Sequence, residues 1–179
     1  MSRQWTFVAL ILGGLLAGAG AMVWFEAGAT RVEVGKSAPE FHAIDLRSGD
    51  SVSLRDRYRG QVTLVNIWAT WCLPCKVEMP SMERLYQSLG SQGFKIAAVS
   101  IDQGNPEDVL AFASNLHVSF DVLQDRLGKI QELYETTGVP ESFLLDRRGV
   151  LIKRVIGAHD WDSEVNRKLI QRLLDDSEK

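Results

Sequence analysis

The two cysteines of this chain stand three residues apart, in the segment Trp71-Cys72-Leu73-Pro74-Cys75. In a chain with no other thiol, this spacing is typical of dithiol–disulfide exchange. The pair follows an apolar run over residues 62–68, which suits a strand-to-helix turn. Cys72 would then lie at a helix N-terminus, where free N–H groups and the helix dipole favour a thiolate. We therefore predict that Cys72 attacks and that Cys75, one turn into the helix, is the resolving thiol.

The residues next to the cysteines predict a surface for a substrate. Pro74 would occupy an early helical position, where its missing N–H has no cost. Trp71 and Trp68 offer apolar area beside the thiol, which suits an unfolded peptide segment. For Trp68 we expect core packing instead, and for Trp71 both interpretations stay open. Together with Trp71, we assign Leu73 and Pro74 to the predicted groove.

Glu78 is a candidate for proton transfer. It follows Cys75 by three residues, so both would share one helical face, and that face would point into the domain. Burial would raise the pKa of the carboxyl. A carboxyl that can hold a proton beside a resolving thiol is a plausible proton donor and acceptor. The alternative is an ordinary solvated charge on the helix.

Composition excludes several other classes of protein. The chain has 179 residues, enough for one domain and an extra segment, and a net charge of −3 gives no reason to expect nucleic acid. Two cysteines are too few for a disulfide-stapled scaffold. The histidines, His42, His117 and His159, are scattered and form no zinc pattern with the cysteines, so we expect them on the surface or in loops. We expect no cofactor and no metal, because the cysteine pair is itself a redox centre.

The N-terminal segment predicts a membrane anchor. Residues 5–25 contain no charged residue, and the run is close to the ~20 residues that span a bilayer. Arg3 precedes it and Glu26 follows, which places residues 1–4 in the cytoplasm and the rest outside, at the extracytoplasmic (periplasmic) side of the cytoplasmic membrane. We expect residues 26–36 to be a tether. A cleaved signal peptide ending near residues 27–29 is the alternative, and it delivers the domain to the same oxidising compartment.

Residues 37–176 read as one α/β domain. Helical patterns separate the early strands, which implies parallel crossovers, and a late hairpin implies an antiparallel edge. We therefore expect a mixed central sheet with helices on both faces and a hairpin at its start. The expected strands are residues 41–44, 51–54, 62–68, 94–101, 120–123, 142–145 and 150–156. The expected helices are residues 74–89, 106–116, 130–134 and one ending near 174.

Two motifs carry a family resemblance. They are VNIWATWCLPCKVEMP at residues 65–80 and TGVPESFLLDRRG at residues 137–149. Together they resemble the thioredoxin superfamily, and more narrowly the membrane-anchored TlpA/ResA/CcmG-like thiol–disulfide oxidoreductases of cytochrome c maturation. The resemblance covers about 140 residues, roughly the size of one domain. It implies a thioredoxin-like fold with a helix–strand insert between the motifs.

The resemblance also implies roles for residues. It makes Cys72 the nucleophile and Cys75 the resolving thiol. Val139-Pro140 is by itself only a candidate cis bond before a strand, but the resemblance implies a cis-proline that faces the disulfide. Glu78 matches an acidic residue near the active site, and Glu141 is expected near the peptide groove with Val139, where relatives differ. Asn66 stands where cytosolic thioredoxins keep a buried Asp, which counts against a general thioredoxin.

The function implied is reduction of disulfides outside the cytoplasmic membrane. In the family, the substrate is typically the Cys-x-x-Cys-His segment of apocytochrome c, and electrons come from a transmembrane thiol reductant. The expected partners are thus exported thiol proteins, the reductant and the membrane. Three alternatives remain: an oxidant or isomerase, a binding module whose disulfide is permanent, and a peroxidase of the peroxiredoxin type. The residues do not fix the reduction potential, which separates a reductant from an oxidant.

Overall fold

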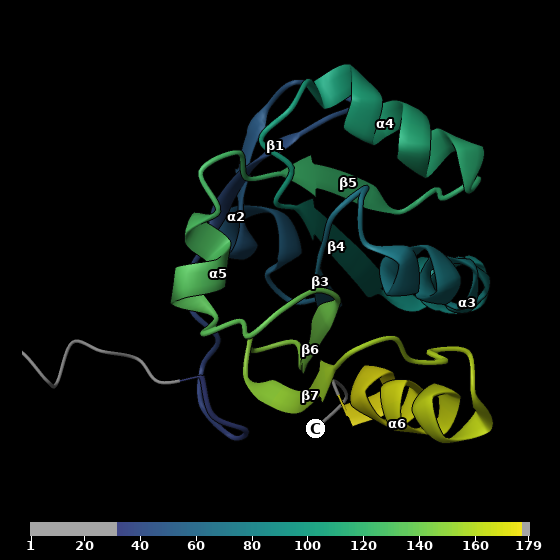
Figure 1. Cartoon of the computed structure of the whole chain (residues 1–179). Coiled ribbons are helices and arrows are strands. Elements are labelled where there is room, and N and C mark those ends of the chain that lie inside the picture. Colours follow the sequence, from purple (N-terminus) through teal and green to yellow (C-terminus); the bar gives the residue numbers. More distant parts are fainter. Residues whose placement is uncertain (1–31, 177–179) are drawn as a thin grey trace, which may run out of the picture. The chain divides into compact units, whose positions relative to one another are not determined.

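The computed structural model describes residues 32–176. Within them, seven strands form one mixed sheet in the order β2-β1-β5-β4-β3-β6-β7 (Figure 1). The strands are β1 (His42–Asp45), β2 (Ser51–Ser53), β3 (Val62–Trp68), β4 (Phe94–Ser100), β5 (Asp121–Gln124), β6 (Glu141–Leu145) and β7 (Leu151–Ile156).

The centre of the sheet is β3, and every residue of this strand is buried. It pairs in parallel with β4 on one side and antiparallel with β6 on the other. A strand covered on both faces reads as a continuous apolar run, which is why its position could be predicted from the sequence. Because side chains alternate along a strand, Leu64, Asn66 and Trp68 point to one face, and Val65 and Ile67 point to the other.

Helices cover both faces of the sheet. The helices are α2 (Leu54–Tyr58), α3 (Leu73–Leu89), α4 (Pro106–Asn115), α5 (Lys129–Leu133) and α6 (Glu164–Asp175), with a short 3-10 turn, η1 (Gly90–Gln92). Helices α3, α4 and α6 share one apolar core with the sheet, and α2 and α5 pack into the other (Figure 1). Along this first face α6 lies against α3, where Arg167 donates to Ser88 at 2.9 Å.

The predicted mixed sheet and its N-terminal hairpin are confirmed. The hairpin β1–β2 joins the same sheet, because β1 pairs antiparallel with β5. Helix α2 was not expected; Ser53 caps it by accepting a hydrogen bond from the Asp56 N–H at 3.2 Å. The predicted anchor at residues 5–25 lies outside the described residues. Within residues 32–176, no helix has both the length and the apolar character needed to cross a bilayer.

Candidate active site

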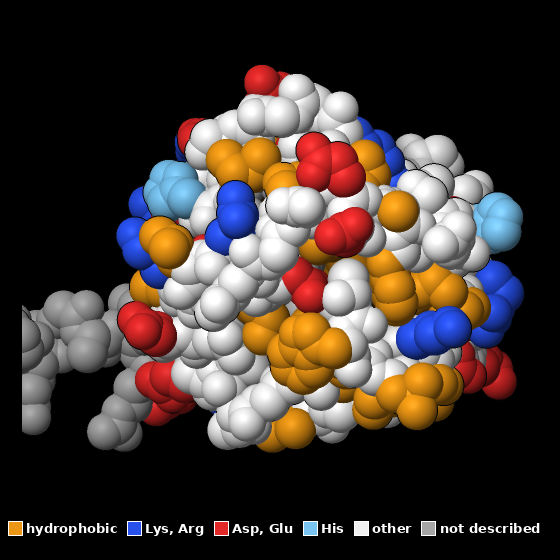
Figure 2. Space-filling view, turned by 45° about the horizontal axis from the view of Figure 1, so that its top comes forward, with side chains coloured by type: hydrophobic (Ala, Val, Ile, Leu, Met, Phe, Trp, Pro, Cys, Tyr) orange, Lys and Arg blue, Asp and Glu red, His pale blue; other side chains and the backbone are white. Residues whose placement is uncertain are grey.

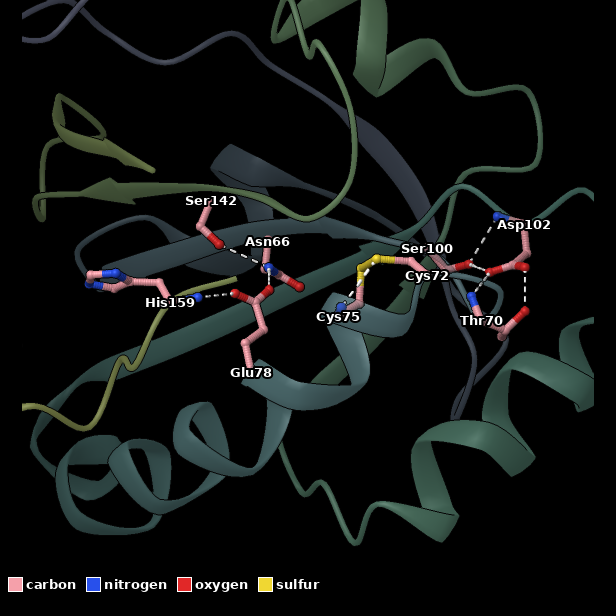
Figure 3. Close-up of a disulfide and its surroundings, with 9 residues drawn as sticks. All are labelled: Asn66, Thr70, Cys72, Cys75, Glu78, Ser100, Asp102, Ser142 and His159. Carbon is pink, nitrogen blue, oxygen red and sulfur yellow. Dashed lines mark hydrogen bonds between the residues drawn. A yellow bond between two sulfur atoms is a disulfide. The ribbon is translucent and has the colours of Figure 1, made fainter. Parts of the chain in front are cut away.

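The loop before the cysteines is held by Asp102, which follows β4. The Asp102 carboxylate accepts hydrogen bonds from the Thr70 N–H at 2.9 Å, from the Thr70 hydroxyl at 2.6 Å and from the Ser100 hydroxyl at 2.6 Å (Figure 3). Asp102 is almost fully buried. Since β4 is the neighbour of β3, this carboxylate fixes the chain where it leaves β3 and turns toward Cys72.

Cys72 and Cys75 form a disulfide with an S–S distance of 2.04 Å. Cys72 is the N-cap of α3, and its sulfur accepts a hydrogen bond from the Cys75 N–H at 3.2 Å. Cys72 keeps 4% of its surface exposed and Cys75 keeps none. The expected strand-to-helix position is therefore confirmed, and Cys72 is the sulfur that an incoming thiol can reach. The attacking and resolving roles follow from this geometry as predictions.

Exposed apolar side chains surround the N-terminal turn of α3. Trp71 is 69% exposed, and Leu73 and Val77 are exposed to a similar degree, while Trp68 is fully buried. Core packing is thus correct for Trp68 and wrong for Trp71. The space-filling view shows apolar side chains gathering on a surface that also carries acidic groups (Figure 2). The residues assigned to the predicted groove beside Cys72 are thus exposed, namely Trp71, Leu73 and Pro74. Their contact with a substrate stays a prediction.

The bond between Val139 and Pro140 is cis, as the family resemblance implied. It leads directly into β6, where Glu141 pairs with Ile67 of β3. Pro140 is therefore level with Trp68, at the point where the chain leaves β3 for the cysteines. Val139 packs against the apolar core that contains both cysteines.

Glu141 has a positioning role that the sequence did not indicate. Its carboxylate is fully buried and pairs with Arg154 of β7 at 2.5 Å, and it accepts the Thr137 N–H at 3.0 Å. Arg154 also donates to the Glu135 carbonyl at 2.8 Å. These bonds hold the segment that precedes the cis-proline. The expected contact of Glu141 with a substrate stays a prediction, since its carboxylate is buried and paired with Arg154.

Glu78 lies inside the domain, with 2% of its surface exposed, so the solvated-charge alternative is wrong. One carboxylate oxygen accepts a hydrogen bond from the Asn66 amide at 2.7 Å, and the other accepts the His159 N–H at 3.2 Å (Figure 3). Burial raises the pKa of Glu78 to about 7, against the opposing effect of the hydrogen bonds from Asn66 and His159. This carboxyl can therefore hold or release a proton near neutral pH.

A cavity of about 280 Å³ borders Glu78 on the side of the β7–α6 loop. Its lining includes Pro80 and Ser81 of α3 and His159 of the loop. The lining of this cavity includes Glu78 and neither cysteine. The sequence did not point to this arrangement, because His159 contributes its main chain rather than its ring.

Comparison with known proteins decides the family. The family model described as "AhpC/TSA family" matches residues 34–154. The chain belongs to this family. It is 36% identical over 162 residues to the thiol-disulfide oxidoreductase ResA of Geobacillus kaustophilus, covering 89% of this chain and 90% of that protein. It is 35% identical over 124 residues to the thioredoxin-like protein YneN of Bacillus subtilis, covering 67% and 69%.

Solved structures agree with this assignment. A putative thiol:disulfide interchange protein DsbE from Chlorobium tepidum superposes with a TM-score of 0.71 at 30% identity, covering 80% of this chain and 99% of that one. StoA from Bacillus subtilis superposes with a TM-score of 0.59 at 25% identity, covering 77% and 98%. The protein is therefore a thiol–disulfide oxidoreductase of the ResA/CcmG type with a thioredoxin-like fold. A binding module with a permanent disulfide does not fit these relatives.

Proposed function

We propose that this oxidoreductase is tethered to the cytoplasmic membrane by residues 5–25 and reduces disulfides of exported proteins on the extracytoplasmic side. The proposed substrate is the Cys-x-x-Cys-His segment of apocytochrome c, and a transmembrane thiol reductant supplies the electrons. The relatives named thiol-disulfide oxidoreductase and thiol:disulfide interchange protein support disulfide exchange, and the exposed apolar surface around Cys72 suits a protein substrate. The choice of apocytochrome c follows from the family resemblance of the two motifs. The cysteine pair is proposed as the only redox centre.

The reaction needs two exchange steps. The Cys72 thiolate attacks a substrate disulfide, forming a Cys72–substrate disulfide and releasing one substrate sulfur as a thiolate. The Cys75 thiolate then attacks the Cys72 sulfur, forming the Cys72–Cys75 disulfide and releasing the second substrate thiolate. The substrate gains two electrons and the protein loses two. The transmembrane reductant restores the dithiol by the same chemistry in reverse.

The observation that carries the reducing direction is the buried carboxyl of Glu78, which follows Cys75 by about one turn of α3. A strongly oxidising pair owes its potential to a reduced form that is stabilised by a very acidic thiol. An ionised carboxylate beside the cysteines disfavours a thiolate, because like charges repel in a buried site. We therefore expect a reduction potential below about −200 mV, whereas a value near about −120 mV would indicate the alternative, an oxidant.

Two measurements test the proposal. Equilibration of the protein with glutathione or dithiothreitol buffers gives the potential. Cys75→Ser in membranes should trap substrates as mixed disulfides on Cys72, and these should contain Cys-x-x-Cys-His segments. Cys72→Ser with Cys75→Ser is the control that should trap nothing. Capture of substrates without that segment, or a potential on the oxidising side, would contradict the proposal.

The tether is tested separately. We expect the full chain to stay in the membrane fraction after alkaline carbonate washing, with its domain cut only by protease added to the extracytoplasmic side. Release of a mature form that begins after residue 29 would instead support the cleaved signal peptide.

A further inference from the structure

The Asn66 carboxamide bonds the Glu78 carboxyl and has its oxygen turned toward Cys75. It is fully buried on β3 and faces α3. Its amide nitrogen donates to Glu78 at 2.7 Å and to the Ser142 hydroxyl at 2.9 Å, so both N–H groups are used. Its carbonyl oxygen is buried and has no hydrogen-bond donor among residues 32–176. Figure 3 shows this oxygen on the side of the carboxamide that is turned from Glu78 toward Cys75.

Reduction changes what Cys75 offers to this oxygen. In the disulfide, the Cys75 sulfur carries no proton and can donate no hydrogen bond. Reduction to the thiol adds an S–H group, which is a donor. A buried acceptor that lacks a partner is costly, so a thiol donor next to it is favoured. The Asn66 oxygen is therefore positioned to hold Cys75 in the protonated form while Glu78 is ionised.

The Asn66 carboxamide can also form hydrogen bonds when Glu78 is protonated and Cys75 is a thiolate. An ionised carboxylate only accepts hydrogen bonds, which keeps the Asn66 nitrogen toward Glu78. A protonated Glu78 can donate, and the Ser142 hydroxyl can donate or accept. Rotation by half a turn would then place the oxygen toward Glu78 and the nitrogen toward Cys75. In that position the nitrogen donates to a thiolate.

We propose that Asn66 couples the proton on Glu78 to the proton on Cys75, by offering its oxygen to the Cys75 thiol or its nitrogen to the Cys75 thiolate. The coupling acts in the resolving step, and it rests on the proposed role of Glu78 in proton transfer. The thiol of Cys75 loses its proton, the Glu78 carboxylate takes up one proton, and the site as a whole neither gains nor loses a proton. The Cys75 sulfur then bonds to Cys72, the bond from Cys72 to the substrate breaks, and the substrate sulfur leaves with the electron pair as a thiolate.

Other charged groups lie on the elements packed around Asn66 and Glu78. On β6 the buried Glu141 is paired with Arg154. On α3 Lys76 is exposed, and Arg84 is paired with Asp162. The β7–α6 loop contributes His159, whose ring contacts Asn166, and the exposed Asp160. These groups are common to the wild type and to the Asn66 variants compared below, so they do not account for a difference between the two.

The test separates the two exchange steps in the full-length reduced protein. A chromogenic aryl disulfide (dithiobis-nitrobenzoate) reacts first with Cys72 and releases one coloured thiolate. Attack by Cys75 then releases a second, so stopped-flow absorbance gives one rate for each cysteine. For Asn66→Leu, we expect the second phase to slow on the order of tenfold at pH 7, because one hydrogen bond to a charged sulfur is lost. Its pH midpoint should rise by about one unit.

A control is Thr63→Val, which removes another buried side-chain hydrogen bond from β3, the one that the Thr63 hydroxyl donates to the Gln61 carbonyl at the far end of the strand. We expect its second phase to stay within about twofold of the wild type. Equal slowing of both phases in Asn66→Leu, or an unmoved second phase, would overturn the proposal. If Asn66→Leu does not fold, Asn66→Ala is measured, and the ratio of its two phases decides in the same way.

Glu78→Gln distinguishes failure of this inference from failure of the proposed role of Glu78. If Glu78→Gln leaves the pH profile of the second phase unchanged, both are wrong. If it changes the profile but Asn66→Leu does not, only the coupling is wrong. Under the proposal, the effects of the two substitutions are non-additive in the double variant, because they remove one shared network.

Discussion

Replacement of Glu78 by Gln should change how the stability of the oxidised protein depends on pH. Burial raises the pKa of this carboxyl from 4.5 to about 7. Below pH 4.5 it is protonated in both the folded and the unfolded state. Above pH 7 it is ionised in both, and the folded state must keep the charge buried. The folded state therefore binds more protons between these values, and the free energy of unfolding falls as pH rises through this window.

The size of the effect follows from the same pKa values. A change from 4.5 to about 7 corresponds to about 3 kcal/mol. Gln has nearly the same shape and stays neutral at every pH. We thus expect the free energy of unfolding of Glu78→Gln, relative to the wild type, to increase by about 3 kcal/mol between pH 4.5 and pH 7.5.

Urea unfolding of the oxidised wild type and variant at several pH values measures this difference. The oxidised state is used because disulfide sulfurs do not titrate. Glu107→Gln, the same exchange at an exposed position of α4, controls for the substitution itself. A difference between Glu78→Gln and wild type that does not vary with pH, or that grows as pH falls, would refute the argument from burial.

Three further predictions concern the residues around the disulfide. Trp71→Ala should lower kcat/KM for a protein substrate by on the order of tenfold, which steady-state kinetics would measure. Because the side chain is exposed, the free energy of unfolding should change by less than about 0.5 kcal/mol in urea unfolding. Asp102→Asn should lower the free energy of unfolding by about 2 kcal/mol and speed hydrogen exchange at the Thr70 amide, which amide-exchange NMR would detect. Arg154→Met should destabilise by about 3 kcal/mol because it leaves the Glu141 carboxylate buried without its partner, and Arg154→Met with Glu141→Gln should recover much of that loss in urea unfolding.

Much of the fold could be predicted because its signals are local. The buried run at β3 and the hairpin β1–β2 follow from patterns within a few residues. The position of Cys72 at the start of α3 also depends on neighbouring residues alone. The cis bond before Pro140 is different, since the residues gave only a candidate and the family resemblance supplied the expectation.

The remaining contacts of the site join residues that are far apart in the chain. Thr70 and Asp102 are separated by 32 positions, Asn66 and Ser142 by 76, and Glu78 and His159 by 81. No local sequence pattern predicts these hydrogen-bond partners, because they depend on which strands are neighbours in the sheet and on where a loop folds back. The burial of Glu141 has the same origin, because β7 brings Arg154 to it.

The sequence by itself determined the chemistry. Two thiols one helical turn apart can form a disulfide with each other, and a strand-to-helix turn places one of them at a helix N-terminus, whatever the rest of the chain does. The tertiary structure decided which group beside the cysteines can hold a proton near neutral pH. Glu78 holds a proton near neutral pH because β3, the β7–α6 loop and α3 bury its carboxyl, and the solvation of a side chain depends on everything packed around it.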